Sequence, residues 1–216
     1  MFSSNLLYLI AVWAPPVLLA ITLHEAAHGW VAHRLGDDTA ARLGRISINP
    51  LRHIDPLGTV VIPLAMLLTT GFVIGWAKPV PVDMRQFRQP ILDMALVAVA
   101  GPLSNFAMAC AWTLLIAMSA MLPAGSETGR FLADAGQAGI TINLILMVLN
   151  LLPIPPLDGG RVVAGVMPPR LALNFMRIEP FGMWLVIALL ISGILGKILW
   201  PVVAHFETII RLVFGL

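Results

Sequence analysis

The chain opens with an apolar run, residues 6–23, that contains no charged side chain. At about 1.5 Å of rise per residue, this run and the apolar residues after it can cross a hydrocarbon core of ~30 Å as a helix. The composition agrees, because 59% of the residues are hydrophobic and 11% are charged, whereas soluble domains carry about 25% charged residues. A soluble core could not bury this much apolar surface, so the sequence predicts an integral membrane protein.

Further apolar stretches follow the first along the chain. They predict an all-α polytopic membrane protein, a bundle of about four to six membrane helices. The last stretch contains His205, Glu207 and Arg211, so it either spans the membrane or lies at its interface. These stretches are residues 59–74, 91–122, 136–152, 181–199 and 201–216.

The connections between the stretches differ in charge. Residues 34–56, 76–90 and 153–180 are rich in arginine or lysine, whereas residues 123–135 contain one arginine and two acidic residues. The positive-inside rule places the first three connections in the cytoplasm, and we expect a multi-pass protein of the cell (plasma or inner) membrane. Because residues 59–74 lie between two cytoplasmic connections, that stretch is predicted to be a re-entrant element.

Two of these connections contain extended segments. Residues 45–49 alternate polar and apolar side chains, which is typical of a short β-strand. The prolines in residues 78–82 favour extended backbone. We therefore expect short membrane-associated β-strands beside the helices.

The sequence His24-Glu25-Ala26-Ala27-His28 follows the first apolar run directly. On a helix, its histidines lie one turn apart on the same face, where both can bind a single Zn²⁺, with Glu25 within reach of a metal-bound water. The alternative is that both histidines only hydrogen-bond to their neighbours. Ionisable residues in a membrane segment are expensive and mark functional sites, which favours the metal site.

A catalytic zinc has three protein ligands, so a third is needed beyond the two histidines. The best candidate is Asp158, since the prolines of residues 150–157 end the preceding helix and Gly159 and Gly160 permit a tight turn. Irregular backbone near membrane depth is tolerated where it lines a polar cavity. Such a segment could direct the carboxylate into the bundle; the alternative role of Asp158 is to cap the next helical turn.

Together, these motifs resemble the site-2 protease family of intramembrane zinc metalloproteases. The resemblance extends over about residues 19–169. Besides the two-histidine motif, the segments that carry it are residues 45–56, 77–82, 101–105 and 150–160. The sequence is similar to the short members of the family, because neither a PDZ nor a CBS domain is evident in it.

The resemblance implies a single metalloprotease domain, residues 1–216, with a catalytic core at about residues 5–169 and C-terminal membrane helices at 181–216. It implies a single zinc ion per chain, held by His24, His28 and Asp158, and Glu25 as the general base that activates the zinc-bound water. Asn150 matches the position that stabilises the reacting carbonyl; the alternative for this side chain is a hydrogen bond to nearby backbone.

The implied function is intramembrane proteolysis: hydrolysis of a peptide bond in or near a transmembrane segment of a membrane protein, towards the cytoplasmic side. Because the amides of such a substrate are locked in a helix, it must unwind, and the extended segments could pair with it as an added strand. Both segments might also be only structural loops. The candidate substrate-binding residues are Ile46, Ser47, Ile48, Lys78 and Val80.

Two other functions stay open at this point. A metal-transporting or metal-sensing protein would line a path through several helices with polar ligands, whereas here the strong ligands form one cluster. An inactive relative that only binds membrane clients is disfavoured by the intact motif. The expected partners are the substrate and the lipid bilayer; nucleic acid is not expected, and a homo-oligomer is left open. Gly101, Ser104 and Ala107 are assigned to close helix packing, and Asn105 could orient a neighbour of the site.

Overall fold

The computed structural model describes residues 2–61 and 78–216, and these residues are mostly helical. Three short helical turns, η1 (Pro50–Arg52), η2 (Pro56–Val61) and η3 (Met84–Gln86), lie in the connections. The α-helices are α1 (Phe2–Arg34), α2 (Thr39–Arg42), α4 (Pro90–Ser119), α5 (Glu127–Asn150), α6 (Asp158–Val166), α7 (Pro169–Met176), α8 (Glu179–Ile191) and α9 (Ile194–Phe214).

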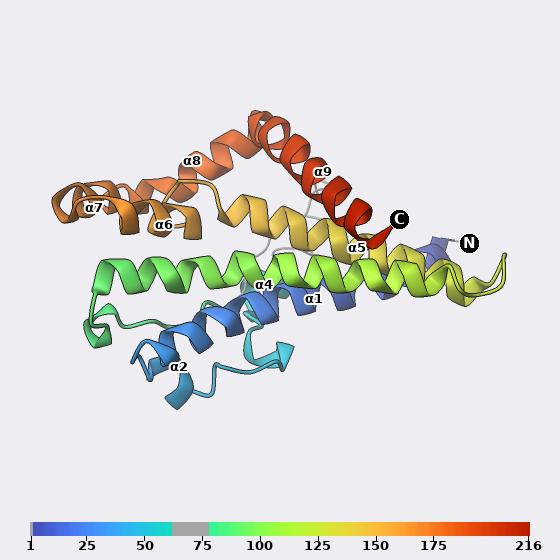
Figure 1. Ribbon diagram of the computed structural model, residues 1–216, viewed down its shortest axis with the longest axis horizontal. Helices are drawn as coiled ribbons and strands as arrows, with labels where there is room; N and C mark the ends of the chain where they lie inside the picture. The colour runs from blue at the N-terminus through green and yellow to red at the C-terminus, as the bar shows by residue number, and fades with distance from the viewer. Residues whose placement is uncertain (1, 62–77) are drawn as a thin grey trace.

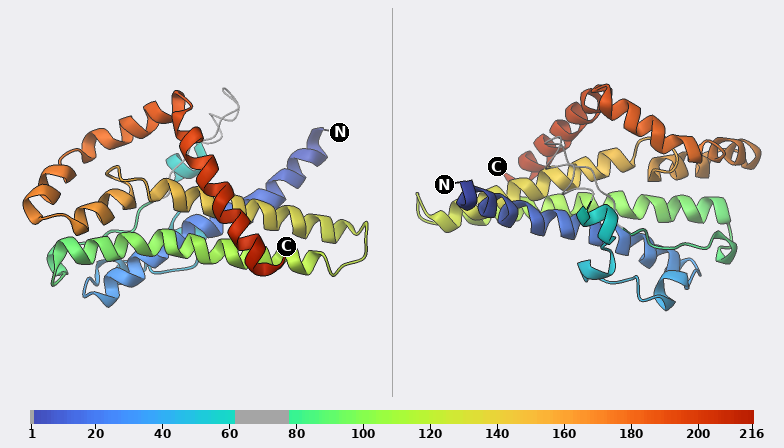
Figure 2. Two further views of the ribbon diagram at one scale, coloured as in Figure 1. Left: turned by 45° about the horizontal axis from the view of Figure 1, so that its top comes forward. Right: turned by 180° about the vertical axis from the view of Figure 1, so that it is seen from behind.

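Helices α1, α4 and α5 run alongside one another and form the body of the protein, with α4 antiparallel to both neighbours (Figure 1). The N-terminus and the α4–α5 turn lie at one end, while the end of α1, the start of α4 and helices α6 and α7 lie at the other (Figures 1 and 2). Helix α9 crosses α5 obliquely. The segment after α1, the segment before α4, and helices α6 and α7 therefore lie at one end of the bundle, whereas η1 and η2 lie nearer its middle (Figures 1 and 2).

The ends of the central helices follow local rules. Pro90 occupies the first turn of α4, where its missing N–H would have no intrahelical partner. The Ser126 side chain accepts a hydrogen bond from Gly129 N and so caps α5. Helix α4 therefore begins at the end of the connection 76–90, whereas α5 begins at Glu127, within the predicted connection 123–135.

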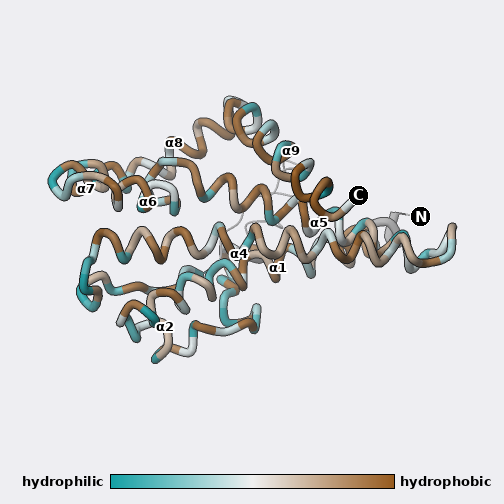
Figure 3. Tube along the Cα trace, viewed as in Figure 1, coloured by the Kyte–Doolittle hydropathy of each residue, from teal (hydrophilic) through white to brown (hydrophobic). Residues whose placement is uncertain are grey.

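Three helices of the described residues are long and apolar enough to cross a membrane: Leu6–Arg34, Pro90–Ser119 and Glu127–Asn150. Helices α7 and α8 meet at 59° and make a fourth if the bent pair counts as one span. Figure 3 shows the apolar character of these helices and the polar residues around α2 and α6. The predicted polytopic helical fold is confirmed, but the described residues contain three or four candidate spans where about four to six are expected.

The helices α4 and α5 pack closely because glycine faces bulky side chains. A Cβ added to Gly139 would lie 2.2 Å from the Trp112 ring, and one at Gly136 would lie 2.6 Å from Ile116. Small residues allow such close approach in membrane helices. Ile140 and Leu144 of α5 pack in a buried cluster with residues of both α4 and α9.

The predicted strand at residues 45–49 is wrong, since none of the described residues forms a β-strand. A strand requires a partner for its backbone groups. Here side chains bind that backbone instead: His53 Nε2 contacts Ser47 O at 2.9 Å, and Asn49 N donates to Ser47 Oγ. The alternating pattern therefore marks an irregular segment held by side chains.

Two other predictions concern helix boundaries. The boundary predicted between the stretches 181–199 and 201–216 is wrong. Helix α8 ends at Ile191, Gly193 adopts a positive φ of 72°, and Pro201 lies inside α9. Helices α1 and α4 likewise contain internal prolines, Pro15, Pro16 and Pro102. The re-entrant element predicted at residues 59–74 lies, beyond Val61 of η2, outside the described residues.

Candidate metal centre

The structure brings His24, His28 and Asp158 together, two from α1 and one from the first residue of α6. The Nε2 atoms of the two histidines are 3.0 Å apart, and Asp158 Oδ2 lies 3.2 Å from His24 Nε2 and 3.4 Å from His28 Nε2. All three residues are buried. The three side chains proposed as ligands thus converge on one point.

The far nitrogen of each imidazole is bound to an acceptor. His24 Nδ1 lies 2.6 Å from Asn105 Oδ1, and His28 Nδ1 lies 2.7 Å from the backbone oxygen of Val97. Carbonyl oxygens only accept, so each Nδ1 carries the proton. In the neutral rings, each Nε2 therefore presents its lone pair to the other and to Asp158, the tautomer that a metal ligand needs.

A cation fits this arrangement better than any other group. Among the described residues, the buried Asp158 Oδ2 has no hydrogen-bond partner, and two imidazole lone pairs face it. Two histidines and a carboxylate are the ligand set of catalytic zinc sites that keep a coordination position open.

Gly101 on α4 is the surface against which both imidazoles pack. A Cβ there would lie 2.5 Å from His24 Cε1 and 2.5 Å from both His28 Cε1 and His28 Nε2. The packing role expected for Gly101 is thus specific: it leaves room for the two rings themselves rather than only for the helix backbones.

Asp158 is placed by a tight turn after α5. A Cβ at Gly159 would lie 2.2 Å from Leu151 O, so the turn folds directly back on the end of α5. Gly182 of α8 packs on the same loop, because a Cβ there would overlap Pro155 O at 1.4 Å. The carboxylate is the first residue of α6, which packs on α4.

Glu25 is half-buried and is oriented by a loop. Its Oε2 accepts a hydrogen bond from Val80 N at 2.7 Å. Arg45 Nη2 donates to the oxygens of Lys78 at 2.6 Å and Pro79 at 3.3 Å. On the other side of Val80, Asp37 Oδ2 accepts from Asp83 N at 2.7 Å. The buried side chains of Arg45 and Asp37 therefore hold the segment that positions Glu25.

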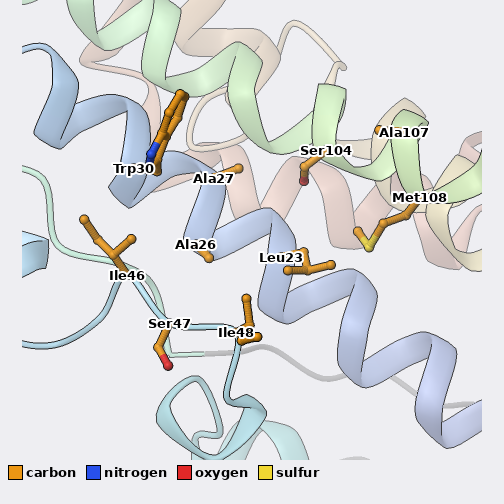
Figure 4. Close-up of a pocket in the computed structure, with 10 residues that line it drawn as sticks. All are labelled: Leu23, Ala26, Ala27, Trp30, Ile46, Ser47, Ile48, Ser104, Ala107 and Met108. Carbon is orange, nitrogen blue, oxygen red and sulfur yellow. The ribbon is translucent and has the colours of Figure 1, made fainter. Parts of the chain in front are cut away.

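The candidate substrate-binding residues lie in two places. Val80 is beside Glu25, and Lys78 is held through its carbonyl oxygen by Arg45. Ile46, Ser47 and Ile48 instead line an apolar groove of about 440 Å³ (Figure 4). The α1 residues of this groove recur at helical spacing and form a face other than that of the histidines; they are Leu23, Ala26, Ala27 and Trp30.

Asn150, predicted to stabilise the reacting carbonyl, donates from Nδ2 to Leu146 O of its own helix at 2.9 Å. This is the alternative contact, a hydrogen bond to nearby backbone at the end of α5. The catalytic role of Asn150 stays a prediction.

Asn105, which the sequence suggests only as a residue that could orient a neighbour of the site, contacts a candidate metal ligand directly. It is fully buried, binds His24 Nδ1, and donates from Nδ2 to Ala20 O and to Asn143 Oδ1. The sequence does indicate this residue, because Asn105 is an amide within a long apolar stretch, and burying a polar side chain in a membrane segment costs free energy.

A helix bearing His24-Glu25-Ala26-Ala27-His28, joined by a distant carboxylate among helices able to span a membrane, defines the class of membrane-embedded metallopeptidases. Residues 127–193 match the model of Peptidase family M50. The protein named "Putative zinc metalloprotease YwhC" of Bacillus subtilis is 39% identical over 91% of this chain and 88% of its own length. The chain belongs to peptidase family M50, the site-2 protease family.

Other relatives carry similar names. The Rip2 protein of Mycolicibacterium smegmatis, named in the same way as a zinc metalloprotease, is 28% identical over 91% of this chain and 71% of its own length. Rip2 of Mycobacterium tuberculosis is 30% identical over 73% of this chain and 56% of its own length. No solved structure matches the chain.

Proposed function

We propose that the chain is an intramembrane zinc endopeptidase that hydrolyses a peptide bond in or near a transmembrane segment of another membrane protein. The observation that carries this proposal is the convergence of His24, His28 and Asp158 within a membrane helix bundle, directly beside Glu25. The names of the relatives specify zinc, and the ligand set suits that metal.

His24 and His28 would hold the zinc through Nε2, and Asp158 through Oδ2. When bound, zinc supplies a Lewis acid that polarises a carbonyl oxygen and makes a coordinated water more acidic. The protein's part is to keep the three ligand atoms in place, through Asn105 and Val97 for the histidines and the Gly159 turn for the aspartate.

Glu25 would act as the general base. Val80 N fixes its Oε2, so Oε1 is the atom that takes a proton from the attacking water and then returns it to the leaving amine. Asn150 would stabilise the oxyanion after its amide turns away from Leu146 O.

The unwound substrate would contact Ile46, Ser47, Ile48, Lys78 and Val80. Because Val80 N already donates to Glu25, Val80 would bind through its side chain or its carbonyl oxygen. The groove beside Ile46 and Ile48 is apolar, which suits a segment that comes from the membrane.

The site would face the cytoplasm in the cell membrane. The end of α1 and helices α6 and α7 lie at one end of the bundle, and Asp158 is the first residue of α6 (Figure 1). These elements contain Arg34, Arg161 and Arg170. Basic residues concentrate on the cytoplasmic side of membrane proteins.

The test is Glu25→Gln in the full chain, co-expressed with a single-span membrane protein as candidate substrate. We expect zinc to stay bound and cleavage to fall by roughly 10²- to 10⁴-fold, the usual contribution of a general base. Glu127→Gln, an exposed carboxylate at the start of α5, is the matched control. Unchanged cleavage by Glu25→Gln contradicts the proposal, and zinc flux in proteoliposomes would favour metal transport instead.

A further inference from the structure

We propose that Asn143 on α5 is a positioning residue that sets the zinc affinity of the centre through Asn105, by fixing the tautomer of His24. Asn143 has no hydrogen bond to any of the three candidate ligands among the described contacts. The proposal rests on the proposed function in one respect, that the centre holds a metal.

The hydrogen bonds that join Gly139, Asn143, Asn105 and His24 in series form a relay, which begins at a backbone carbonyl of α5. Because Gly139 O only accepts, Asn143 must turn its Nδ2 towards it, and the two atoms are 2.8 Å apart. The Oδ1 of Asn143 then faces α4, where it accepts from Asn105 Nδ2 at 2.9 Å. Asn143 is therefore oriented by its own helix before it orients anything else.

The amide of Asn105 is oriented in turn. Its Nδ2 donates to Asn143 Oδ1 and, at 3.2 Å, to Ala20 O of α1. Both partners accept, so Asn105 Oδ1 is left to face His24 Nδ1 at 2.6 Å. A reversed Asn105 amide would offer N–H to Nδ1 and would favour the proton on Nε2, which points into the metal centre. The relay thus keeps the ligand nitrogen of His24 unprotonated.

The two histidines differ in this respect. His28 Nδ1 is bound by the backbone oxygen of Val97, which cannot be reversed by a side-chain rotation. His24 depends on two amide side chains, both fully buried. Polar side chains are costly inside a membrane bundle, and fully paired amides give specific geometry there. Substitutions at Asn105 or Asn143 can therefore change the tautomer of His24, whereas the tautomer of His28 is fixed by backbone.

The test measures zinc affinity of the purified full chain by competition with a chelator. Substituting the hydrogen-bonding partner of a metal-ligating histidine lowers metal affinity by about 10- to 100-fold, and we expect this of Asn105→Leu. Asn143→Leu should lower affinity about tenfold, because Ala20 O still orients Asn105 in part. Asn143→Thr keeps a donor for Gly139 O, as Thr113 has for Ala109 O, and an acceptor for Asn105 Nδ2, so its zinc affinity should stay within about threefold of the wild type.

Thr113→Val is the matched control. Thr113 is a fully buried polar residue of α4 whose hydroxyl donates to Ala109 O, away from the histidines. Its substitution should leave zinc affinity unchanged. The absorption spectrum of bound Co²⁺ gives a second readout, which should shift in Asn143→Leu and not in Thr113→Val. Asn143→Ala takes the place of Asn143→Leu if the latter does not fold.

Wild-type zinc affinity in Asn143→Leu overturns the relay, and so does an equal loss in Asn143→Thr and Asn143→Leu, because that result indicates a packing role. A wild-type protein that binds no zinc contradicts the proposed function itself. Zinc binding by the wild type, with no effect of Asn143→Leu, contradicts only the relay.

Discussion

The two sides of the candidate site are built differently, although both start from neighbouring residues of α1. His24 and His28 lie against α4, where Gly101 leaves them room and buried acceptors bind their outer nitrogens. Glu25 instead binds the backbone of Val80, in a connection outside the helix bundle.

The supports differ in the same way. The histidine side is held by the packed helices α1, α4 and α5, whereas the glutamate side is held by the side chains of Arg45 and Asp37 reaching across loops. Metal binding and proton transfer should therefore be separable by mutation. Substitutions in the bundle should lower metal affinity, and substitutions in the loops should lower activity with the metal retained.

Gly101→Ala should have the largest effect. Its Cβ would overlap three ring atoms of His24 and His28, so both imidazoles must move. We expect metal affinity to fall about 100-fold or more, at or beyond the upper range for changes next to a metal ligand, with cleavage lost in parallel. Zinc content measured against Gly196→Ala checks this, since among the described residues a Cβ at Gly196 meets only Trp200, at 3.8 Å. Retained zinc in Gly101→Ala would show that the rings do not depend on α4.

Arg45→Gln should come next and should act on the other side. It removes the donors to Lys78 O and Pro79 O, so Val80 and Glu25 lose their fixed position. Small misplacements of catalytic groups cost up to about 100-fold, and we expect a roughly tenfold lower kcat with zinc content unchanged. The control is Arg42→Gln, because the Arg42 side chain is 77% exposed and forms a surface ion pair with Asp38. Loss of zinc in Arg45→Gln would contradict the separation of the two sides.

Asp37→Asn should have the smallest effect, mainly on stability. Asp37 is fully buried and accepts from Thr39 N and Asp83 N, and an amide can accept from only one of them. Leaving one buried N–H unpaired costs about 1–3 kcal/mol, which a thermal unfolding curve in detergent would show as a lower midpoint. Asp38→Asn, a change to a half-exposed neighbour, should shift the midpoint less. An unaltered midpoint in Asp37→Asn would mean that the loop does not depend on this carboxylate.

The histidine side is the part that sequence can predict best. His24 and His28 are four residues apart on one uninterrupted helix, so local geometry alone places them together. Asp158 is predictable because prolines end α5 and Gly159 permits the turn. The hydrogen bond from His24 to Asn105 cannot be predicted in this way, because the two residues are 81 positions apart and meet only through the packing of α1 on α4.

The loop side resists prediction for a different reason. The alternation at residues 45–49 is local, but a strand also needs a partner, and here the side chains of Ser47 and His53 bind the backbone instead. Similarly, the boundary between α8 and α9 depends on Gly193 rather than on Pro201, since a helix in a bundle can accommodate a proline.

The most direct test of the account is the metal content of purified wild-type protein and of Asp158→Ala. We predict a single zinc ion per chain in the wild type and its loss in Asp158→Ala, because two histidines alone leave the site one ligand short. Cleavage of a candidate helical substrate should disappear with the metal. Zinc retained at wild-type level in Asp158→Ala would contradict the assignment of His24, His28 and Asp158 as the metal centre.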